Sequence, residues 1–384
     1  MPHDPASLTA AVKAEARRLG FDLVGITTPD PPPHLETYRR WLAQGRHGEM
    51  HYLASERAIE RRSDPRRILP TCRSILVLAV RYPPPSEAQI GSGRVAVYAL
   101  GDDYHDVLPP RLRALVAFIE SCVGHAVPHR VYTDTGPLLE RDLAQRAGLG
   151  WIGKNTCLIH PTLGSYFLLA EVLLGIELQP DPAFEADRCG SCTRCLDACP
   201  THCILRDRTL DATRCISYWT IERKGSIPAE LRPAQGTWLF GCDICQQVCP
   251  WNLRFAAADG EPAFEPRPPL RPPDTLRLLE MDSAAFRAAF RRSPLRRPGR
   301  RGMLRNATVA AGNAASPEAV PVLIRLLRDE PEAMVRAHAA WALGRIGGAS
   351  AAAALQAAAE DESDPQVRAE IGAALASPTG SPAP

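Results

Sequence analysis

The stretch CGSCTRCLDACP, residues 189–200, contains four cysteines spaced three, three and four residues apart and ends in Cys-Pro. This spacing is typical of bacterial ferredoxin segments, in which the fourth cysteine ligates the second of two 4Fe–4S clusters. A second run is therefore expected, and residues 242–250 supply it as CDICQQVCP. That run lacks the usual first cysteine, and Cys215 is the expected replacement from a loop.

Exchange of the fourth cysteines between the two runs assigns four ligands to each cluster. Cluster 1 is expected to be held by Cys189, Cys192, Cys195 and Cys249. Cluster 2 is expected to be held by Cys199, Cys215, Cys242 and Cys245. The alternative, a zinc ribbon, needs only four cysteines in two close pairs. Eight cysteines with two Cys-Pro ends favour two clusters, and Cys203 is expected to be a buried thiol nearby.

The composition indicates a cytoplasmic protein of several domains. A chain of 384 residues with 45% apolar residues is long enough for two or three cores. Its start, MPHDPASLTA, has neither a basic nor an apolar signal-peptide region, and no membrane span is expected. The twelve cysteines are then thiols or metal ligands and not disulfides. The formal net charge of +2 provides no global attraction for nucleic acid.

Residues 1–182 are expected to form the catalytic domain. The segments 21–27, 74–80 and 129–134 are predicted strands that alternate with amphipathic helices. Residues 165–178 have the apolar density of a strand and the length of a helix, so the sequence does not decide between the two. The alternation indicates an α/β or a mixed α+β layer domain. The predicted fold class is multi-domain α+β, with an α/β domain first.

Three further segments follow the first domain. Residues 183–255 are expected to form the two-cluster ferredoxin-like domain, and residues 256–300 a Pro- and Arg-rich linker. In residues 301–378 the patterns Leu-Arg-Asn-Ala, Val-Arg-Ala-His and Val-Arg-Ala-Glu start at 304, 335 and 367. Helix pairs at this period predict a HEAT-like α-solenoid, and a single alanine-rich bundle is the alternative.

A concentration of basic residues precedes these repeats. Residues 287–305 contain eight arginines, and no acidic residue lies between Asp282 and Glu318. Such a stretch suits the phosphates of RNA, although a solvated basic loop would have the same composition. The residues expected to contact RNA are Arg296, Arg297, Arg300, Arg301 and Arg305.

The clusters carry single electrons, so residues 1–182 should hold the acceptor. A dinucleotide fingerprint and a Walker loop are absent from the sequence. A cobalamin motif with a cobalt-binding histidine, D-x-H-x-x-G, begins at Asp103 and fails at Leu108. The residues alone leave the cofactor open.

Five ordered motifs resemble the epoxyqueuosine reductase family: YALGDDYH at 98–105, DTGPLLERDLAQRAGLGWIGKNT at 134–156, CGSCTRCLDACP, CISYWTIE at 215–222 and GCDICQQVCPWN at 241–252. The resemblance runs from about residue 45 to 255. It implies base-off cobalamin together with two 4Fe–4S clusters. It also implies reduction of an epoxide to an alkene on the modified wobble base of tRNA.

The resemblance implies that Asp134 is the general acid that protonates the epoxide oxygen. A raised pKa would suit this role, and burial against the corrin would provide it. The structural alternative is that Asp134 caps the following helix. The residues expected to contact the cofactor are Arg62, Val97, Tyr98, Tyr104, His105, Asp134, Lys154, Asn155, Ser217, Gly241, Cys242 and Asp243. Arg62 could instead lie in water, and Lys154 with Asn155 could instead form a loop ion pair.

Two other functions remain open at this level. One is a cobalamin-dependent reductase of a small molecule such as an organohalide. The other is a HEAT-type RNA-binding scaffold whose clusters are structural. The main hypothesis is a tRNA reductase that acts as a monomer, takes electrons from an unidentified donor and does not bind a membrane.

Overall fold

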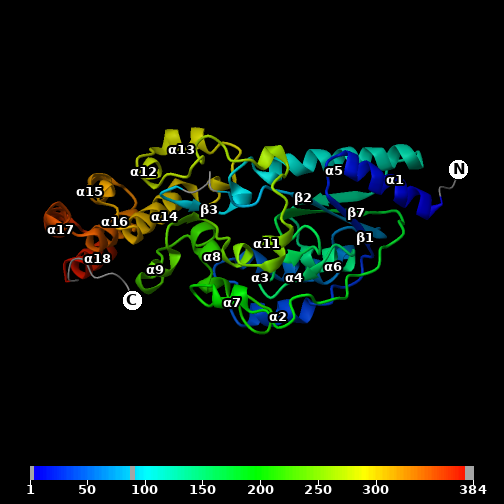
Figure 1. Cartoon of the computed structure of the whole chain (residues 1–384), viewed down its shortest axis with the longest axis horizontal. Helices are drawn as coiled ribbons and strands as arrows, with labels where there is room; N and C mark the ends of the chain where they lie inside the picture. The colour runs from blue at the N-terminus through cyan, green and yellow to red at the C-terminus, as the bar shows by residue number, and fades with distance from the viewer. Residues whose placement is uncertain (1–3, 87–90, 377–384) are drawn as a thin grey trace. The chain divides into compact units, whose positions relative to one another are not determined.

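A computed structural model describes residues 4–86 and 91–376 (Figure 1). The chain divides into two compact units, each built from segments that are separate in sequence. Unit 1 comprises Met1–Pro84, Gly101–Thr213 and Asp243–Glu265. Unit 2 comprises Pro85–Leu100, Arg214–Cys242 and Pro266–Pro384. The predicted segment 183–255 is thus shared between the units, and residues 377–378 lie outside the described residues.

Unit 1 is built on a four-stranded antiparallel sheet in the order β1-β2-β7-β4. The strands are β1 (Leu23–Thr27), β2 (Ser74–Arg81), β7 (Phe167–Leu174) and β4 (His129–Tyr132). The three predicted strands are therefore present, and β2 is central as its continuous apolar sequence indicates. Segment 165–178, for which strand and helix were both possible, contains the strand β7, which pairs along its length with β2.

Helices cover both faces of this sheet (Figure 1). The long helices α1 (Pro5–Arg18) and α5 (Tyr104–Val123) pack together on one face. The short helix α6 (Glu140–Arg146) packs on β1, β2 and β7 from the other face. An apolar cluster that includes Val77, Leu143 and Leu173 fills the space under α6. The strand pairs of this sheet are antiparallel. Of the two predicted arrangements, unit 1 therefore has the mixed α+β one and not the α/β one.

The remaining elements of unit 1 are short. α2 (Leu35–Ala43), α3 (His51–Ala54) and α4 (Glu56–Ser63) follow β1, and the hairpin β5 (Trp151–Ile152) and β6 (Leu158–Ile159) follows α6. The cysteine-rich segments add α7 (Arg194–Asp197), α10 (Ile244–Gln247) and α11 (Pro250–Phe255). Gly150 enters the hairpin with a φ of 154°, and a Cβ there would lie 2.2 Å from the carbonyl oxygen of Ile159. The close approach of the two strands therefore requires glycine.

Unit 2 begins with a small parallel pair, β3 (Arg94–Val95) and β8 (Trp238–Phe240), packed on α8 (Ile216–Ile221). The turn η3 (Val97–Ala99) follows β3, and α9 (Arg232–Gln235) precedes β8. The remaining helices are α12 (Thr275–Leu279), α13 (Ser283–Ala289), α14 (Gly299–Asn313), α15 (Val320–Asp329), α16 (Ala333–Ile346), α17 (Ala349–Asp361) and α18 (Pro365–Ala376). The predicted linker 256–300 thus contains two helices, and α12 packs on α14.

The C-terminal helices form the predicted repeats. α14, α16 and α18 pack side by side, and α15 and α17 complete the pairs. The recurring motif places Leu304, Val335 and Val367 in the core with at most 1% of their surface exposed. Among the described residues, no helix has both the length and the apolar sequence needed to cross a membrane.

Candidate active site and iron–sulfur centre

The acidic residue expected to donate a proton lies just beyond strand β4. Asp134 has an exposed side chain and a left-handed backbone conformation, with a φ of 54°. Its Oδ2 accepts a hydrogen bond of 2.8 Å from the phenol of Tyr104, the first residue of α5. Its backbone N–H donates to Oε1 of Glu140 at 2.9 Å. These two contacts hold a conformation that is otherwise unfavourable for aspartate.

Two features of Asp134 differ from expectation. It does not cap α6, because that helix has Leu139 as its N-cap residue and no side-chain hydrogen bond there. It is also exposed, whereas the sequence led us to expect a buried side chain. The carboxyl groups that lose their hydration are those of Glu140 and Glu171, behind Asp134.

Glu140 and Glu171 are functional candidates that the sequence analysis missed. Burial raises the pKa of Glu140 to about 8, and the charge of Asp134 adds to this effect. Burial also raises the pKa of Glu171 well above its ordinary value, with the charge of Glu140 as the second cause. The available signal was the single glutamate inside the apolar run FLLAEVLL of β7.

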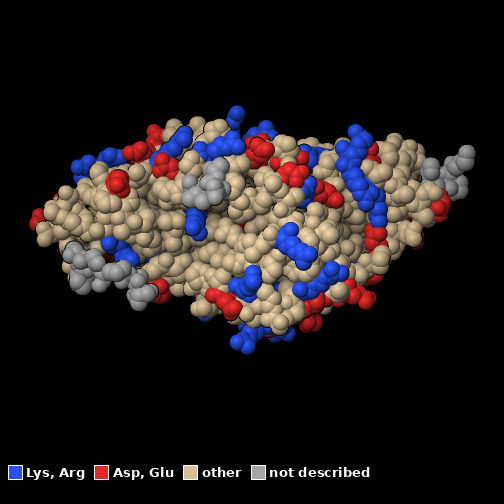
Figure 2. Space-filling model, viewed as in Figure 1, with Lys and Arg blue, Asp and Glu red and all other residues tan. Residues whose placement is uncertain are grey.

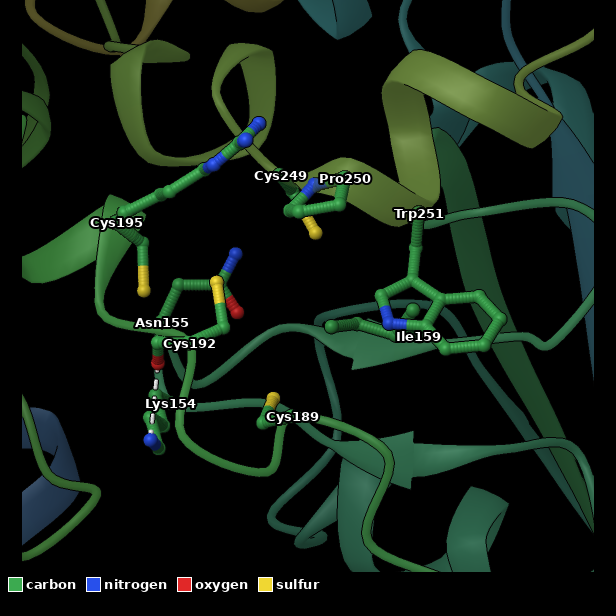
Figure 3. Close-up of a pocket in the computed structure, with 10 residues that line it drawn as sticks. Lys154, Asn155, Ile159, Cys189, Cys192, Cys195, Cys249, Pro250 and Trp251 are labelled. Carbon is green, nitrogen blue, oxygen red and sulfur yellow. Dashed lines mark hydrogen bonds between the residues drawn. The ribbon is translucent and has the colours of Figure 1, made fainter.

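The four cysteines assigned to cluster 1 surround one cavity of unit 1 (Figure 3). The side chains of Cys189, Cys192, Cys195 and Cys249 line this cavity. Burial raises the pKa of the Cys195 thiol to about 11, and Cys189 adds to this effect. Iron binding would replace the thiol protons.

The donor set fits a 4Fe–4S cluster better than a single metal ion. Among residues 4–86 and 91–376, no three His, Cys, Asp or Glu side chains lie close enough to hold one ion. A four-iron cluster instead spreads its thiolates around a larger core. Asn155 lines the same cavity with 3% of its surface exposed, and its Nδ2 has no hydrogen-bond partner among residues 4–86 and 91–376. A cluster sulfur would provide the acceptor that this amide lacks.

Lys154 and Asn155 therefore lie beside the predicted cluster 1 site. The ammonium of Lys154 donates to the carbonyl oxygens of Gly190 at 2.7 Å and Cys192 at 2.9 Å. These carbonyl groups belong to the first Cys-x-x-Cys loop, and Lys154 has no ion pair among the described residues. Its role is to hold that loop in place.

Aromatic residues close the other side of the cluster 1 cavity. The indole N–H of Trp151 points to Sγ of Cys189 at 3.5 Å. Trp151 packs edge-on against Trp251, with 4.9 Å between the ring centroids, and Phe184 stacks on its other side. The sequence analysis missed Trp151, although it stands in the motif GLGWIGKN. An N–H group directed at a ligand sulfur is a contact that tunes cluster potentials.

The ligands assigned to cluster 2 come from both units. Cys199 and Cys245 belong to unit 1, and Cys215 and Cys242 belong to unit 2. Cys203 is buried as expected, and its Sγ lies 3.5 Å from that of Cys199. The ligand set of cluster 2 remains a prediction.

Five of the expected corrin contacts gather within unit 2. Val97 and Tyr98 directly follow β3, Gly241 and Cys242 directly follow β8, and Ser217 lies on α8 beside β8. Because β3 and β8 are parallel, both strands end at the same edge. Tyr98 is partly exposed at this edge, whereas Val97 and Gly241 are buried.

The other expected contacts lie in unit 1. The imidazole of His105 lies 4.1 Å from the ring of Tyr104, and its Nδ1 is 2.7 Å from Oδ1 of Asp103. Arg62 is 9% exposed and packs over the ring of Tyr38, so it does not lie in water. Asp243 is 1% exposed and opens α10.

The basic stretch is less uniform than its sequence indicates. Arg305 is fully buried and donates to the carbonyl oxygens of Trp219, Arg223 and Gly225, so the prediction that it binds RNA is wrong. Arg300 forms a bidentate ion pair with Glu330.

Of the arginines expected to contact RNA, Arg296, Arg297 and Arg301 are exposed, as are Arg287, Arg291 and Arg292 earlier in the stretch. Of these, Arg297 pairs with Glu222 at 2.6 Å, and Arg301 lies 3.6 Å from Glu332. On the face drawn in Figure 2, Lys and Arg side chains are interspersed with Asp and Glu side chains. Part of the positive charge of the stretch is therefore paired with acidic side chains.

Comparison with known proteins identifies the family. The family model described as "Epoxyqueuosine reductase QueG, DUF1730" matches residues 62–135. The models for a 4Fe-4S double cluster binding domain and for HEAT repeats match residues 188–252 and 300–376. The epoxyqueuosine reductase of Pseudomonas aeruginosa is 42% identical over 354 residues, which cover 90% of this chain and 96% of that protein. This chain belongs to the epoxyqueuosine reductase family.

Further members of the epoxyqueuosine reductase family support the assignment. The Escherichia coli enzyme is 37% identical over 351 residues, with 90% of this chain and 91% of that protein covered. An epoxyqueuosine reductase solved with an epoxyqueuosine-modified tRNA-Tyr stem loop superimposes with a TM-score of 0.87 at 34% identity, covering 97% of this chain and 99% of that one. A Bacillus subtilis epoxyqueuosine reductase, solved with its catalytic loop swung out of the active site, gives the same values.

Family membership decides between the three hypotheses. The chain is an oxidoreductase that reduces epoxyqueuosine to queuosine, with cobalamin and 4Fe–4S clusters as cofactors. The predicted fold class, with an α+β core, a double-cluster segment and HEAT repeats, is confirmed. The scaffold and small-molecule hypotheses are set aside.

Proposed function

We propose that this chain acts on epoxyqueuosine carried at the wobble position of tRNA and that Asp134 donates the proton that the epoxide oxygen requires. The reaction consumes two electrons and two protons and yields an alkene and water. When bound, cobalamin supplies a strong reductant that receives single electrons through the clusters. An epoxide oxygen leaves poorly as an alkoxide, so a proton donor lowers the barrier.

The observation that carries this proposal is the position of the Asp134 carboxyl. It is exposed at the edge of the sheet, held by the Tyr104 phenol at 2.8 Å and by the fixed backbone next to Glu140. A preorganised and accessible acid of this kind suits proton transfer to a bound substrate. Tyr104 orients the carboxyl, and His105 stacks on Tyr104.

The same proposal assigns the cofactor and substrate surfaces. Cys189, Cys192, Cys195 and Cys249 ligate cluster 1, and Cys199, Cys215, Cys242 and Cys245 ligate cluster 2. Val97, Tyr98, Ser217 and Gly241 contact the corrin, and exposed Arg296, Arg297 and Arg301 contact tRNA phosphates. We also propose that the chain acts as a monomer with a separate electron donor, because all assigned residues belong to one chain.

Asp134→Asn tests the assignment of the acid, because the amide keeps the shape and loses the transferable proton. We expect turnover of an epoxyqueuosine-containing stem loop to fall by about a hundredfold or more. Cobalamin absorbance and stem-loop affinity should stay at wild-type values. Asp106→Asn, which changes an exposed acid in the first turn of α5, is the matched control. Near-normal turnover by Asp134→Asn would remove Asp134 from the reaction.

A further inference from the structure

Glu171 is a buried acid for which the proposed mechanism has no use so far. It lies in the middle of β7, opposite Val77 of β2 and Tyr132 of β4, and is 0% exposed. Side chains alternate between the faces of a strand. Glu171 therefore shares its face with Phe167, Leu169 and Leu173, which belong to the apolar cluster under α6. A glutamate at this position interrupts an otherwise apolar surface.

Neither carboxyl oxygen of Glu171 has a hydrogen-bond donor among the described residues. The group within hydrogen-bonding reach is the carboxyl of Glu140, at the start of α6. Two ionised carboxylates have only acceptor atoms, so a bond between them requires a proton on one of the two. Burial of a second negative charge here without a partner would also be costly. The geometry therefore calls for one shared proton.

The charges around the pair favour this state. Asp134, on the loop after β4, faces both glutamates and raises the pKa of each. Arg141 of α6 acts on Glu140 in the opposite direction, but its guanidinium donates to the carbonyl oxygen of Thr156 at 2.7 Å. From α5, the phenol of Tyr104 donates to the Asp134 carboxyl. From β2, the register partner is the apolar Val77.

We propose that Glu140 and Glu171 together store one proton directly behind Asp134 and that this proton is the second one consumed in the reaction. In balance, the epoxide takes two electrons from the reduced cofactors and two protons. One proton goes to the oxygen as the first C–O bond breaks. The other goes to the departing hydroxide as the second C–O bond breaks and the alkene forms, giving water.

Glu140 connects the proton shared with Glu171 to the proposed proton donor, Asp134. Its Oε1 accepts the backbone N–H of Asp134 at 2.9 Å, which places the carboxyl beside that residue. Transfer of the stored proton to the Asp134 carboxylate restores the acid within one turnover, and solvent reloads the pair through the exposed Asp134 afterwards. The inference rests on the proposed role of Asp134 as proton donor.

Glutamine variants separate proton storage from positioning. In Glu140→Gln the amide oxygen still accepts the Asp134 N–H, so the loop stays in place while the proton is lost. In Glu171→Gln the amide donates to Glu140 and replaces the shared proton. Glu140→Ala removes the positioning contact as well. Glu177→Gln, at an exposed acid just beyond β7 that pairs with Arg73, is the matched control.

The first measurement does not depend on activity. The infrared difference spectrum of the wild-type protein at neutral pH should contain the C=O band of a protonated carboxylic acid, shifted in D₂O. That band should be absent from Glu171→Gln and from Glu140→Gln and present in Glu177→Gln. A wild-type spectrum without the band would overturn the proposal.

The second measurement is the pH dependence of turnover with reduced cofactors and a saturating stem loop. Wild-type turnover should fall as pH rises through about 8, where Glu140 loses its proton. Both glutamine variants should lose about tenfold or more at neutral pH and should lack this alkaline fall, with KM unchanged. If both glutamine variants keep wild-type rates and pH profiles, Glu140 and Glu171 do not store a proton for the reaction, even if Asp134→Asn is inactive. An active Asp134→Asn would independently show that Asp134 is not the proton donor.

Discussion

Glu171 in unit 1 and Arg305 in unit 2 are both completely buried, yet their surroundings are opposite. Arg305 donates to the carbonyl oxygens of Trp219, Arg223 and Gly225 and to Oδ1 of Asn306, at distances of 2.5 to 3.0 Å. For Glu171, no donor to either carboxyl oxygen is found in the part of the chain that the structure describes. A buried charged group that has hydrogen-bond partners keeps its charge, whereas a buried carboxylate without donors takes up a proton.

The two residues consequently have different tasks. Arg305 connects α14 to the segment around α8 and stabilises unit 2. Glu171 is unfavourable for unit 1 at neutral pH and lies behind the candidate acid. A buried polar group that costs stability, at the edge of a reaction site, is a candidate for function.

The largest effect is expected for Arg305→Ala. The substitution removes the hydrogen bonds from a charged donor to the carbonyl oxygens of Trp219, Arg223 and Gly225, so we expect a loss of roughly 3–5 kcal/mol in the free energy of unfolding. Thermal and urea unfolding followed by circular dichroism measure it. The control is Arg301→Ala, because Arg301 is exposed and its distance to Glu332 is 3.6 Å. A loss below about 1 kcal/mol for Arg305→Ala would show that the network contributes little.

The double variant Glu140→Gln/Glu171→Gln tests whether the buried Glu171 and its neighbour Glu140 share a proton. In the unfolded chain these acids release their protons above about pH 4.5, whereas the folded pair retains one until about pH 8. Wild-type stability should therefore decrease as pH rises through this window, by at most about 1.4 kcal/mol per pH unit. The double variant should be as stable as wild type at pH 4 and more stable at pH 8. Parallel curves of Tm against pH would contradict the shared proton.

The smallest effect concerns exposed arginines of the same stretch as Arg305. Arg296→Ala/Arg301→Ala should weaken stem-loop binding severalfold and reduce the slope of log affinity against log salt by about 0.7 per lost phosphate contact. Arg287→Ala, at another exposed position on α13, is the control. An unchanged salt slope in the double variant would remove these arginines from the tRNA surface.

Sequence spacing predicted what depends on short segments of the chain. The eight-cysteine pattern indicated two clusters, the repeated motifs indicated HEAT helices, and the apolar run at 74–80 indicated a central strand. Each of these is encoded by residues close together in sequence, because loop spacing and side-chain periodicity are local properties.

The sequence by itself determined the family and the cofactor class, and it predicted the cluster 1 ligands, which the structure gathers around one cavity. It could not separate Arg305 from Arg301, since burial depends on which segments pack on α14. It likewise could not assign Asn155 and Lys154 to the cluster or Glu140 and Glu171 to Asp134. Those groupings join residues far apart in the chain, and only tertiary packing sets which polar groups meet a partner and which do not.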